Sequence, residues 1–440
     1  MWVRAAIASG SSWHLGSHPN DALDAGNVMG GGIPALRVAP GRLWVDLSCD
    51  TLDVDIHGGA TAGQGIFGKV DAVTCTVRLA DPDGIYDPLW SGGPFQYGGH
   101  SRLVPGVPVE VFAEVVNPSD SSVQQFPIFT GTADSWGEDW VPHPWQREAT
   151  LIASDPTKTW ARYDKPEQPA VGAGETVQQR VARLVSYFGW SGTVEDPTPG
   201  ASVRTLAATT LAQPGWELLN RTMDDELGAV YFTPSGDLRW INREASTNQP
   251  TPRITLGCAT VQTGAHDILV DATPQKFDLQ LRNDVWGART GGTAQHALSQ
   301  GSMDHFGPYP YQRTDLGLAD DAQALTWAQF VVSLYAFPQI GVDNVTMLPA
   351  IDPASWTVWS TVLSWVLFTD VAHIAWAPPD LPDHVITGDF RVVGVQHTIS
   401  RARWSVTWQT LALRALSLSG IVWTLGPHAN DRLDAGMVMA

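Results

Sequence analysis

The glycine-rich segment at residues 63–69 is the first place where the sequence could carry out chemistry. Its sequence, Gly63-Gln-Gly-Ile-Phe-Gly-Lys69, contains the GxGxxG pattern and most of a P-loop motif. In a P-loop, backbone N–H groups surround the phosphate oxygens. The residue after Lys69 is Val70, so the hydroxyl that would bind Mg²⁺ is missing. The following residues predict a strand, whereas phosphate binding requires the N-terminus of a helix there. A hairpin loop is therefore the favoured interpretation.

Three neighbouring aspartates could supply oxygen ligands to Ca²⁺. They are Asp81, Asp83 and Asp87, directly after a predicted strand. The pattern lacks the remaining positions of an EF-hand loop, including its bidentate glutamate. The Pro-Asp-Gly sequence at 82–84 is typical of a turn, which favours a structural role for these carboxylates.

Two further groups could supply general acid or base catalysis. They are Asp304 with His305, and the Asp-Asp-Glu run at 224–226 on a predicted helix. Surface carboxylates and turn residues explain both more simply. Three cysteines occur, at Cys49, Cys75 and Cys258. They lie far apart and outside any CxxC spacing, and no HExxH or GxSxG motif is present. The sequence thus predicts no catalytic residue, no cofactor site and no metal site.

A repeated segment links the two ends of the chain. Residues 13–29 and 423–439 are identical at twelve of seventeen positions, at a constant offset of 410 residues. Each copy has few apolar residues and is too short to bury a core of its own, so we expect it to dock on a partner. The expected docking residues are shared by both copies: Trp13, Leu15, Asp21, Leu23, Asp24, Val28, Trp423, Leu425, Asp431, Leu433, Asp434 and Val438.

The composition is that of an ordered, acidic chain with many turns. Hydrophobic residues make up 43% and charged residues 16%, which argues against disorder, and 42 Gly with 31 Pro favour many short strands. A net charge of −19 opposes affinity for nucleic-acid phosphates and for anionic membrane surfaces. An acidic wall would still let DNA slide through a channel without sticking, because like charges repel.

No membrane insertion is expected. The uncharged stretch at 356–368 is apolar, but a spanning helix needs ~20 such residues. This stretch predicts instead a buried helix that leads into a strand.

Period-two alternation of apolar and polar residues predicts strands in the first part of the chain. Val54 and Ile56 alternate with acidic residues, and Cys75 and Val77 alternate with threonines. Further strands are predicted at 109–115, 126–132 and 149–153. Together these segments predict one antiparallel barrel or sandwich.

The middle of the chain has a different period. Residues 177–188 have helical spacing that stops at Gly189, and 216–227 form a second predicted helix that ends before Gly228. A predicted hairpin follows at 230–241. This part of the chain therefore predicts an α+β insert.

A second β region follows the insert. One helix interrupts it, capped by Asp320 with Gln323 three residues later, and ended before Pro338. The segments 390–399 and 402–411 predict a long closing hairpin. In its second strand Trp404, Val406 and Trp408 share one face.

Several stretches resemble the hub or minor tail proteins of actinobacterial siphophages, which are distant relatives of contractile-tail baseplate hubs. The motifs of the first barrel lie at 44–50, 77–88, 105–109, 129–132 and 154–155, and those of the second at 283–287, 306–308 and 320–337. The Leu-Asp-Ala-Gly sequences of the repeated segments are similar to the short Leu-Asp-rich ends of such tail proteins.

This resemblance implies a mainly β chain with two hub-type antiparallel β-barrel domains, a small mixed α+β domain and extended terminal arms. The predicted boundaries are an N-terminal docking arm at 1–33, the first barrel at 34–155, the insert at 156–262, the second barrel at 263–415 and a C-terminal docking arm at 416–440.

The resemblance further implies a structural protein at the distal end of the phage tail, in the virion. Its expected partners are two further copies in a homotrimer, a hexameric distal tail or tail tube protein, other minor tail proteins, and genomic DNA that passes through during ejection without specific binding. The chain ends about 25 residues after the second predicted barrel. We therefore expect no appended peptidoglycan-degrading module and no enzymatic activity.

One alternative starts from the twenty tryptophans. Indole faces stack on sugars, so the chain could be a carbohydrate-binding or wall-degrading tail protein that interacts with a receptor. Burial of these side chains in barrel cores and at subunit interfaces is the favoured explanation, because Trp is enriched in both.

Overall fold

A computed structural model gives the fold of most of the chain. It describes residues 2–10, 38–39, 42–60, 69–97, 100–117, 119–139, 147–163, 169–195, 204–247, 251–261, 263, 265–274, 281–338, 342–352, 355–412, 423–424 and 432–433. Among the described residues, more than twice as many lie in strands as in helices, which confirms the predicted mainly β class.

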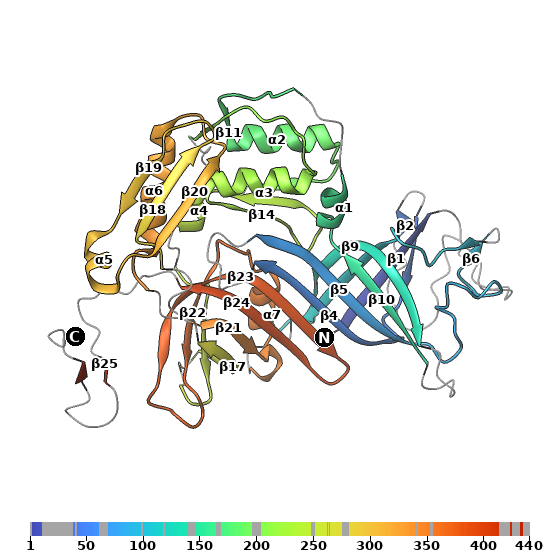
Figure 1. Ribbon diagram of the computed structural model, residues 1–440. Coiled ribbons are helices and arrows are strands. Elements are labelled where there is room, and N and C mark those ends of the chain that lie inside the picture. Colours follow the sequence, from blue (N-terminus) through green and yellow to red (C-terminus); the bar gives the residue numbers. More distant parts are fainter. Residues whose placement is uncertain are drawn as a thin grey trace.

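An antiparallel sheet occupies the N-terminal part of the chain (Figure 1). Its strands are β1 (Trp2–Gly10), β2 (Val38–Ala39), β3 (Arg42–Asp46), β4 (Thr51–Ala60), β5 (Val70–Ala80), β8 (Pro108–Val116), β9 (Val123–Asp139) and β10 (Glu148–Ser154). They lie in the order β2-β3-β1-β8-β9-β10-β5-β4. Val54, Ile56, Cys75 and Val77 are buried as their alternation predicts. A small hairpin of β6 (Gln96–Tyr97) and β7 (His100–Ser101) lies in the connection before β8.

The last six strands of the large sheet close into a barrel. They are β16 (Ile254–Cys258), β17 (His266–Pro274), β21 (Val342–Met347), β22 (Val371–Trp376), β23 (Ile386–Ser400) and β24 (Trp404–Ala412). Closure occurs because β23 pairs with both β22 and β24. The predicted hairpin is confirmed as β23 and β24, and Trp404, Val406 and Trp408 are buried. The barrel is not wholly antiparallel, because β16 pairs in parallel with β17 and β22.

The two β units form one continuous structure. Strand β4 of the first unit pairs with β23 of the barrel, from Asp53 opposite Ser400 to Gly59 opposite Gly394. Buried side chains of both units belong to a single hydrophobic core, which includes Val54 of β4 and Trp408 of β24. The first sheet therefore continues into the barrel wall, and the described pairings do not close it on itself.

The insert packs helices against short strands (Figure 1). Its helices are α1 (Thr157–Arg162), α2 (Val177–Phe188), α3 (Gly215–Glu226) and α4 (Arg243–Thr247). Its strands are β11 (Glu175–Thr176), β12 (Val194–Glu195), β13 (Thr205–Leu206), β14 (Ala229–Phe232) and β15 (Leu238–Ile241). Strands β14 and β15 form the predicted hairpin, and β12 adds to β15 in parallel.

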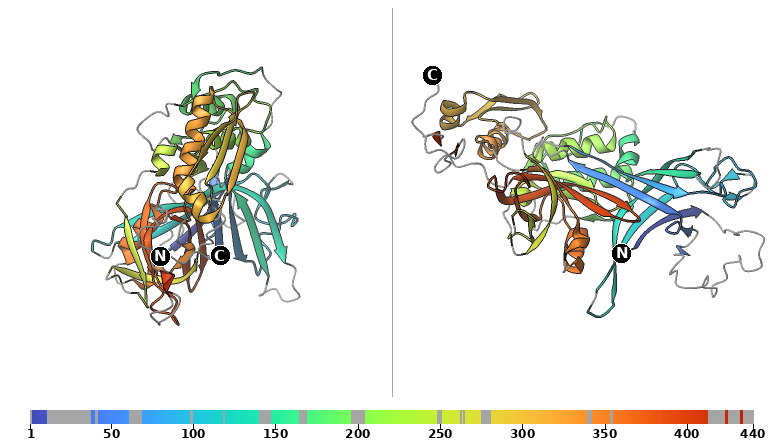
Figure 2. Two further views of the ribbon diagram at one scale, coloured as in Figure 1. Left: turned by 60° about the vertical axis from the view of Figure 1, so that its left-hand side comes forward. Right: turned by 90° about the horizontal axis from the view of Figure 1, so that it is seen from below.

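A further layer lies beside the insert. It contains β18 (Asp284–Arg289), β19 (Gln295–Leu298), β20 (Pro310–Leu316), α5 (Gln300–Phe306) and α6 (Asp321–Tyr335). Seen from below in Figure 2, this layer and the first sheet lie on opposite sides of the molecule. Trp327 of α6 and Val285 of β18 share a hydrophobic core with Leu219 of α3 and Val181 of α2.

The cores group residues differently from the predicted domain boundaries. The layer at 281–338 was expected in the second barrel but packs with the insert. Strand β16 was expected in the insert but belongs to the barrel wall. Periodicity along a chain identifies elements, and it does not identify which elements share a core.

The end of α2 and both ends of α6 agree with the sequence predictions. Thr176 and Gln179 form a capping box at the start of α2, and Gly189 ends that helix with a left-handed φ of 71°. Asp320 caps α6, its side chain accepting from the Gln323 N–H, and α6 ends before Pro338 as predicted.

The end of α3 differs in one detail from the prediction. Its left-handed residue is Leu227, with a φ of 60°, rather than Gly228. Gly228 is needed for a different reason, because a Cβ there would lie 2.1 Å from the Ile241 carbonyl oxygen.

The apolar stretch near residue 360 forms a buried helix, as predicted. Helix α7 (Ser355–Leu363) follows a short 3-10 turn, η4 (Pro349–Ile351), and precedes β22. Across the barrel core the ring centroids of Trp359 and Trp404 are 4.4 Å apart, as are those of Trp365 and Trp408. Within the described residues, no helix has the length and apolar character that crossing a membrane requires.

Candidate functional site

The residues that could do chemistry in the glycine-rich segment are only partly described. Gly63 to Gly68 lie outside the described residues, whereas Lys69 is exposed and precedes β5 directly. The element after the segment is thus a strand, as predicted, and it offers no helix N-terminus for a phosphate.

The aspartates of residues 81–87 hold a turn. The buried Asp81 carboxylate accepts the Ile85 and Tyr86 N–H groups at 2.7 and 3.1 Å, and Asp87 accepts the Leu89 N–H at 2.7 Å. Burial raises the pKa of Asp81. Among the described residues, no three His, Cys, Asp or Glu side chains gather in a way that could hold a metal ion.

The two acid–base candidates lie in separate elements. Asp304 and His305 lie in α5, where Asp304 accepts a hydrogen bond from Gln300 at 2.7 Å and His305 stacks edge-on against Phe306. The 224–226 run lies at the end of α3.

The expectation of surface carboxylates at 224–226 is wrong. Asp225 is 3% exposed and Glu226 is 0% exposed, because α3 is packed between α2, the β14–β15 hairpin and the β18–β20 layer. The Glu226 carboxylate accepts from Arg204 Nη1 at 2.9 Å and from the Arg243 N–H at 3.3 Å. The buried charge of Glu226 is compensated by the guanidinium group of Arg204, as a buried charge must be.

Little of the repeated arms is described. Trp423 and Leu433 lie in the short strands β25 (Trp423–Thr424) and β26 (Arg432–Leu433), which pair with each other. Ten of the predicted docking residues lie outside the described residues: Trp13, Leu15, Asp21, Leu23, Asp24, Val28, Leu425, Asp431, Asp434 and Val438. Residues 2–10, expected in the N-terminal arm, instead form β1 between β3 and β8 of the first sheet.

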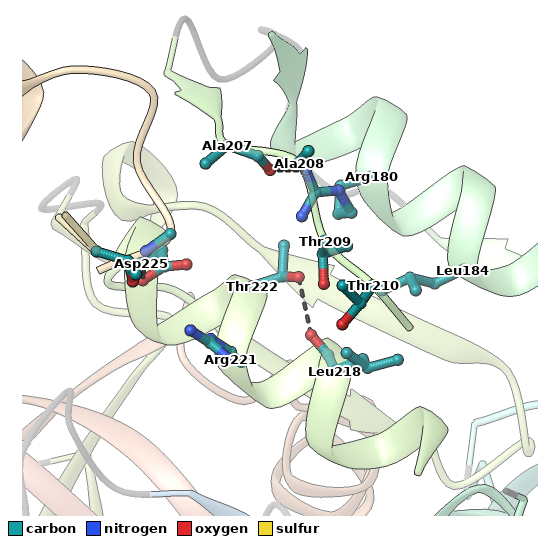
Figure 3. A pocket seen from close by; sticks show the side chains of 12 residues that line it. Arg180, Leu184, Ala207, Ala208, Thr209, Thr210, Leu218, Arg221, Thr222 and Asp225 are labelled. Atoms are coloured by element: carbon teal, nitrogen blue, oxygen red, sulfur yellow. Dashed lines mark hydrogen bonds between the residues drawn. The ribbon is translucent and has the colours of Figure 1, made fainter. Parts of the chain in front are cut away.

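A polar cavity of about 210 Å³ lies between α2, α3 and the segment at 207–210 (Figure 3). Arg180 enters it from α2, and Arg221, Thr222 and Asp225 line it from α3. The β18–β20 layer contributes Thr290 and Gly317 to the wall.

Arg180 is held firmly in the cavity wall. Its Nε donates to Glu175 at 2.5 Å, and its Nη2 donates to the carbonyl oxygens of Gly172 and Ala207 at 3.0 and 2.6 Å. Glu175 also accepts a hydrogen bond from Arg183 at 2.6 Å, so its single carboxylate forms ion pairs with two guanidinium groups. The Arg180 side chain is therefore fixed, and the surrounding wall keeps an excess of positive charge.

Among the described residues that line the cavity, Asp225 is the one with a carboxyl group. Its Oδ1 accepts the Gly317 N–H at 3.0 Å. Burial raises the pKa of Asp225 to about 7, while Arg313 and Arg221 oppose that rise. The carboxyl group is therefore only partly ionised near neutral pH.

Sequence reasoning missed this cavity. The available signal was modest: Arg221 and Asp225 are four residues apart on a predicted helix, and hence on one face. Nothing in the sequence shows that Arg180 and the 207–210 segment meet that face, because their meeting depends on how α2 packs on α3.

A second, smaller cavity of about 80 Å³ lies where the first sheet, the β14–β15 hairpin and the barrel meet. Asp155 and His397 both line it. Burial raises the pKa of Asp155 to about 7 and lowers the pKa of His397 to about 4. The Asp155 Oδ1 accepts the Thr157 N–H at 3.0 Å, directly between β10 and α1.

Two solved structures share this architecture. A tail protein from Neisseria meningitidis is 14% identical with a TM-score of 0.55, and the match covers 84% of this chain and 93% of that one. The 43 kDa tail protein of prophage MuSo2 from Shewanella oneidensis is 10% identical with a TM-score of 0.51, covering 84% and 94%. The chain has the fold of phage tail proteins. No family model matches the sequence, and no curated protein matches it.

Many of the described tryptophans lie in the cores of the tail-protein fold, as the composition predicted. Eight of them are buried: Trp160, Trp216, Trp240, Trp327, Trp359, Trp365, Trp404 and Trp408. Trp286 of β18 is 38% exposed and stacks on His296, with centroids 4.0 Å apart. Burial of large aromatic area thus accounts for much of the tryptophan content.

Asp155 gives the tail-protein fold a testable pH dependence. Its pKa is near 4 in an unfolded chain and about 7 when folded. Between these values the unfolded state has lost a proton that the folded state retains, so stability falls as pH rises, and it levels off above about pH 7. The slope of the unfolding free energy against pH reports how many more protons the folded state binds than the unfolded state. Replacing Asp155 with asparagine should reduce this difference by about one proton per molecule. Urea unfolding between pH 4.5 and 8 measures it.

The matched control for this measurement is Asp83→Asn, which removes an exposed carboxylate from a turn. That variant should keep the wild-type slope. An Asp155→Asn variant with an unchanged slope would show that Asp155 does not retain its proton in the folded chain.

Proposed function

We propose that this chain is a structural, non-enzymatic hub protein at the distal end of a bacteriophage tail. The observation that carries the proposal is the tail-protein fold, which spans 84% of the chain and almost the full length of two tail proteins. In this role three copies form a ring that joins the hexameric tail tube to the distal tip proteins and surrounds the DNA channel.

The way the β units are joined supports this role. Pairing of β4 with β23 and a shared core join the first sheet and the barrel into one continuous structure. Three such chains present six β units around an axis, which suits a sixfold tube above them. The net charge of −19 supports passage of DNA without adhesion.

The repeated arms are proposed to fasten the ring to its neighbours. Two arms per chain give six similar peptides in a trimer, a number that matches a sixfold partner. Strand addition to an exposed sheet edge is one way for such short segments to dock.

Removal of residues 424–440 tests the docking role. The shortened chain should fold with an unchanged far-UV circular dichroism spectrum, yet its incorporation into virions should fall at least tenfold. A chain that carries the same residues 424–440 in scrambled order is the matched control for length and composition, and it should fail as well. Normal incorporation of either variant would refute docking by this segment.

The ring itself is tested by imaging tail tips at low resolution. Threefold density that joins the tube at the position of this protein is the expected result. The carbohydrate-binding or wall-degrading alternative predicts instead a purified chain that binds host cells by itself or releases sugars from purified host wall. Either of those activities, in a tip without threefold density, would overturn the proposal.

A further inference from the structure

The cavity between α2 and α3 offers more hydrogen-bond donors than the described chain uses. The Arg180 Nε donates a hydrogen bond to Glu175 and its Nη2 donates to two carbonyl oxygens, while its Nη1 donates to no described residue. Arg221 makes one long hydrogen bond, from Nη2 to the Asp315 carbonyl oxygen at 3.4 Å. Both guanidinium groups therefore retain N–H groups that can bind a ligand.

Hydroxyl groups add to this excess of donors. Thr209, Thr210 and Thr290 line the cavity, and their hydroxyls make no hydrogen bond to a described residue. In Figure 3 the Arg180 side chain reaches toward the 207–210 segment, with Thr222 of α3 across from it. The groups that converge on this space thus suit a ligand that accepts several hydrogen bonds.

The charge balance of the cavity favours an anion. Among the described residues that line it are two guanidinium groups, of Arg180 and Arg221, and one carboxyl group, of Asp225. This local excess of positive charge is unusual in a chain with 45 acidic and 26 basic residues. A carboxylate is the anion that guanidinium groups bind with the best geometry among protein side chains.

We propose that this cavity binds an aspartate carboxylate of the repeated terminal segment, delivered by a neighbouring copy of the chain in the assembly. Both copies of the segment contain the sequence Asn-Asp-x-Leu-Asp, at 20–24 and at 430–434. Each therefore offers two acidic groups to a cationic cavity, together with apolar side chains beside them. The inference rests on the docking role proposed above and supplies one receptor for it.

A labelled peptide of residues 423–440 tests the proposal against the full-length chain by fluorescence anisotropy. The wild-type peptide should bind, and a peptide with Asp431→Asn and Asp434→Asn should bind at least about tenfold more weakly, because each substitution removes the charge-assisted hydrogen bonds that a carboxylate makes with guanidinium groups. Equal binding of both peptides would overturn the proposal.

Variants of the chain locate the site. Arg221→Gln should weaken binding of the wild-type peptide at least tenfold, whereas Arg221→Lys should recover part of it by restoring the charge. Arg401→Gln, the same change in the exposed turn between β23 and β24, is the matched control and should bind normally. Thr209→Val provides a second test that leaves every charge in place, and it should also weaken binding. Normal binding by both Arg221→Gln and Thr209→Val would overturn the proposal.

Inorganic phosphate and acetate distinguish the segment from a free anion as the occupant. If either anion displaces the peptide from the wild-type chain but not from the Arg221→Gln variant, peptide and anion share one carboxylate site. Stabilisation of the chain by phosphate without any peptide binding would overturn the segment as the occupant. If the peptide fails to bind while removal of 424–440 still blocks assembly, the cavity proposal falls and the docking function stands.

Discussion

Replacing Gly59 with alanine is expected to be among the most destabilising single changes in the chain. Gly59 lies in β4 with a φ of 117°, a conformation that L side chains rarely adopt, and it faces Gly394 of β23. A Cβ on Gly59 would lie 2.2 Å from the Gly394 Cα and 2.6 Å from the Val393 carbonyl oxygen. Because the obstacle is backbone, the strands must move apart where the first sheet joins the barrel.

The expected loss for Gly59→Ala is about 2–5 kcal/mol of unfolding free energy, from the left-handed backbone and the steric overlap together. Urea unfolding measures it. Gly106→Ala is the matched control, because Gly106 has a φ of 88° but no atom within 4 Å of an added Cβ. That variant should lose only the backbone part, about 1–2 kcal/mol. Equal losses in the two variants would show that the β4–β23 contact is not tight.

A second large effect is expected at Glu226. This carboxylate is fully buried, pairs with Arg204 at 2.9 Å and accepts the Arg243 N–H, while its backbone carbonyl accepts from Arg243 Nε at 3.0 Å. Glu226→Ala leaves positive charge in the core of the insert without its buried partner. Removing one member of a buried pair costs about 3–5 kcal/mol, so unfolding of this variant should begin at a much lower urea concentration.

Glu244→Gln is the natural comparison, because Glu244 pairs with the same guanidinium group of Arg204 at 2.7 Å. Its side chain is 53% exposed, and surface pairs contribute about 0–1 kcal/mol. The two variants therefore separate burial from charge pairing. A loss at Glu244 as large as that at Glu226 would show that burial does not decide the outcome.

Local sequence patterns predicted the elements well where one face of an element meets a core. The alternation in β4 and β5, the long β23–β24 hairpin, the stop of α2 at Gly189 and the cap of α6 at Asp320 all agree with the structure. Such signals depend on backbone geometry and on a single inward face, and both are encoded in consecutive residues.

Local sequence patterns did not predict burial where contacts between distant parts of the chain determine it. The sequence of α3 looks like a half-exposed helix that ends in carboxylates, yet α2, the β14–β15 hairpin and the β18–β20 layer cover it on several sides. Asp225 and Glu226 are buried for that reason, and the cavity at Arg180 and Arg221 exists for the same reason.

By itself the sequence determined that the chain is mainly β with a helical middle, that α2 ends at Gly189 and α6 begins after Asp320, and that its two ends carry one repeated acidic segment. Only the tertiary structure decided that β4 joins β23, that the barrel includes parallel pairs, and that residues 281–338 pack with the insert. The physical reason is that strand pairing and core sharing unite residues hundreds of positions apart. Their choice depends on shape and on burial of the whole chain rather than on neighbouring residues.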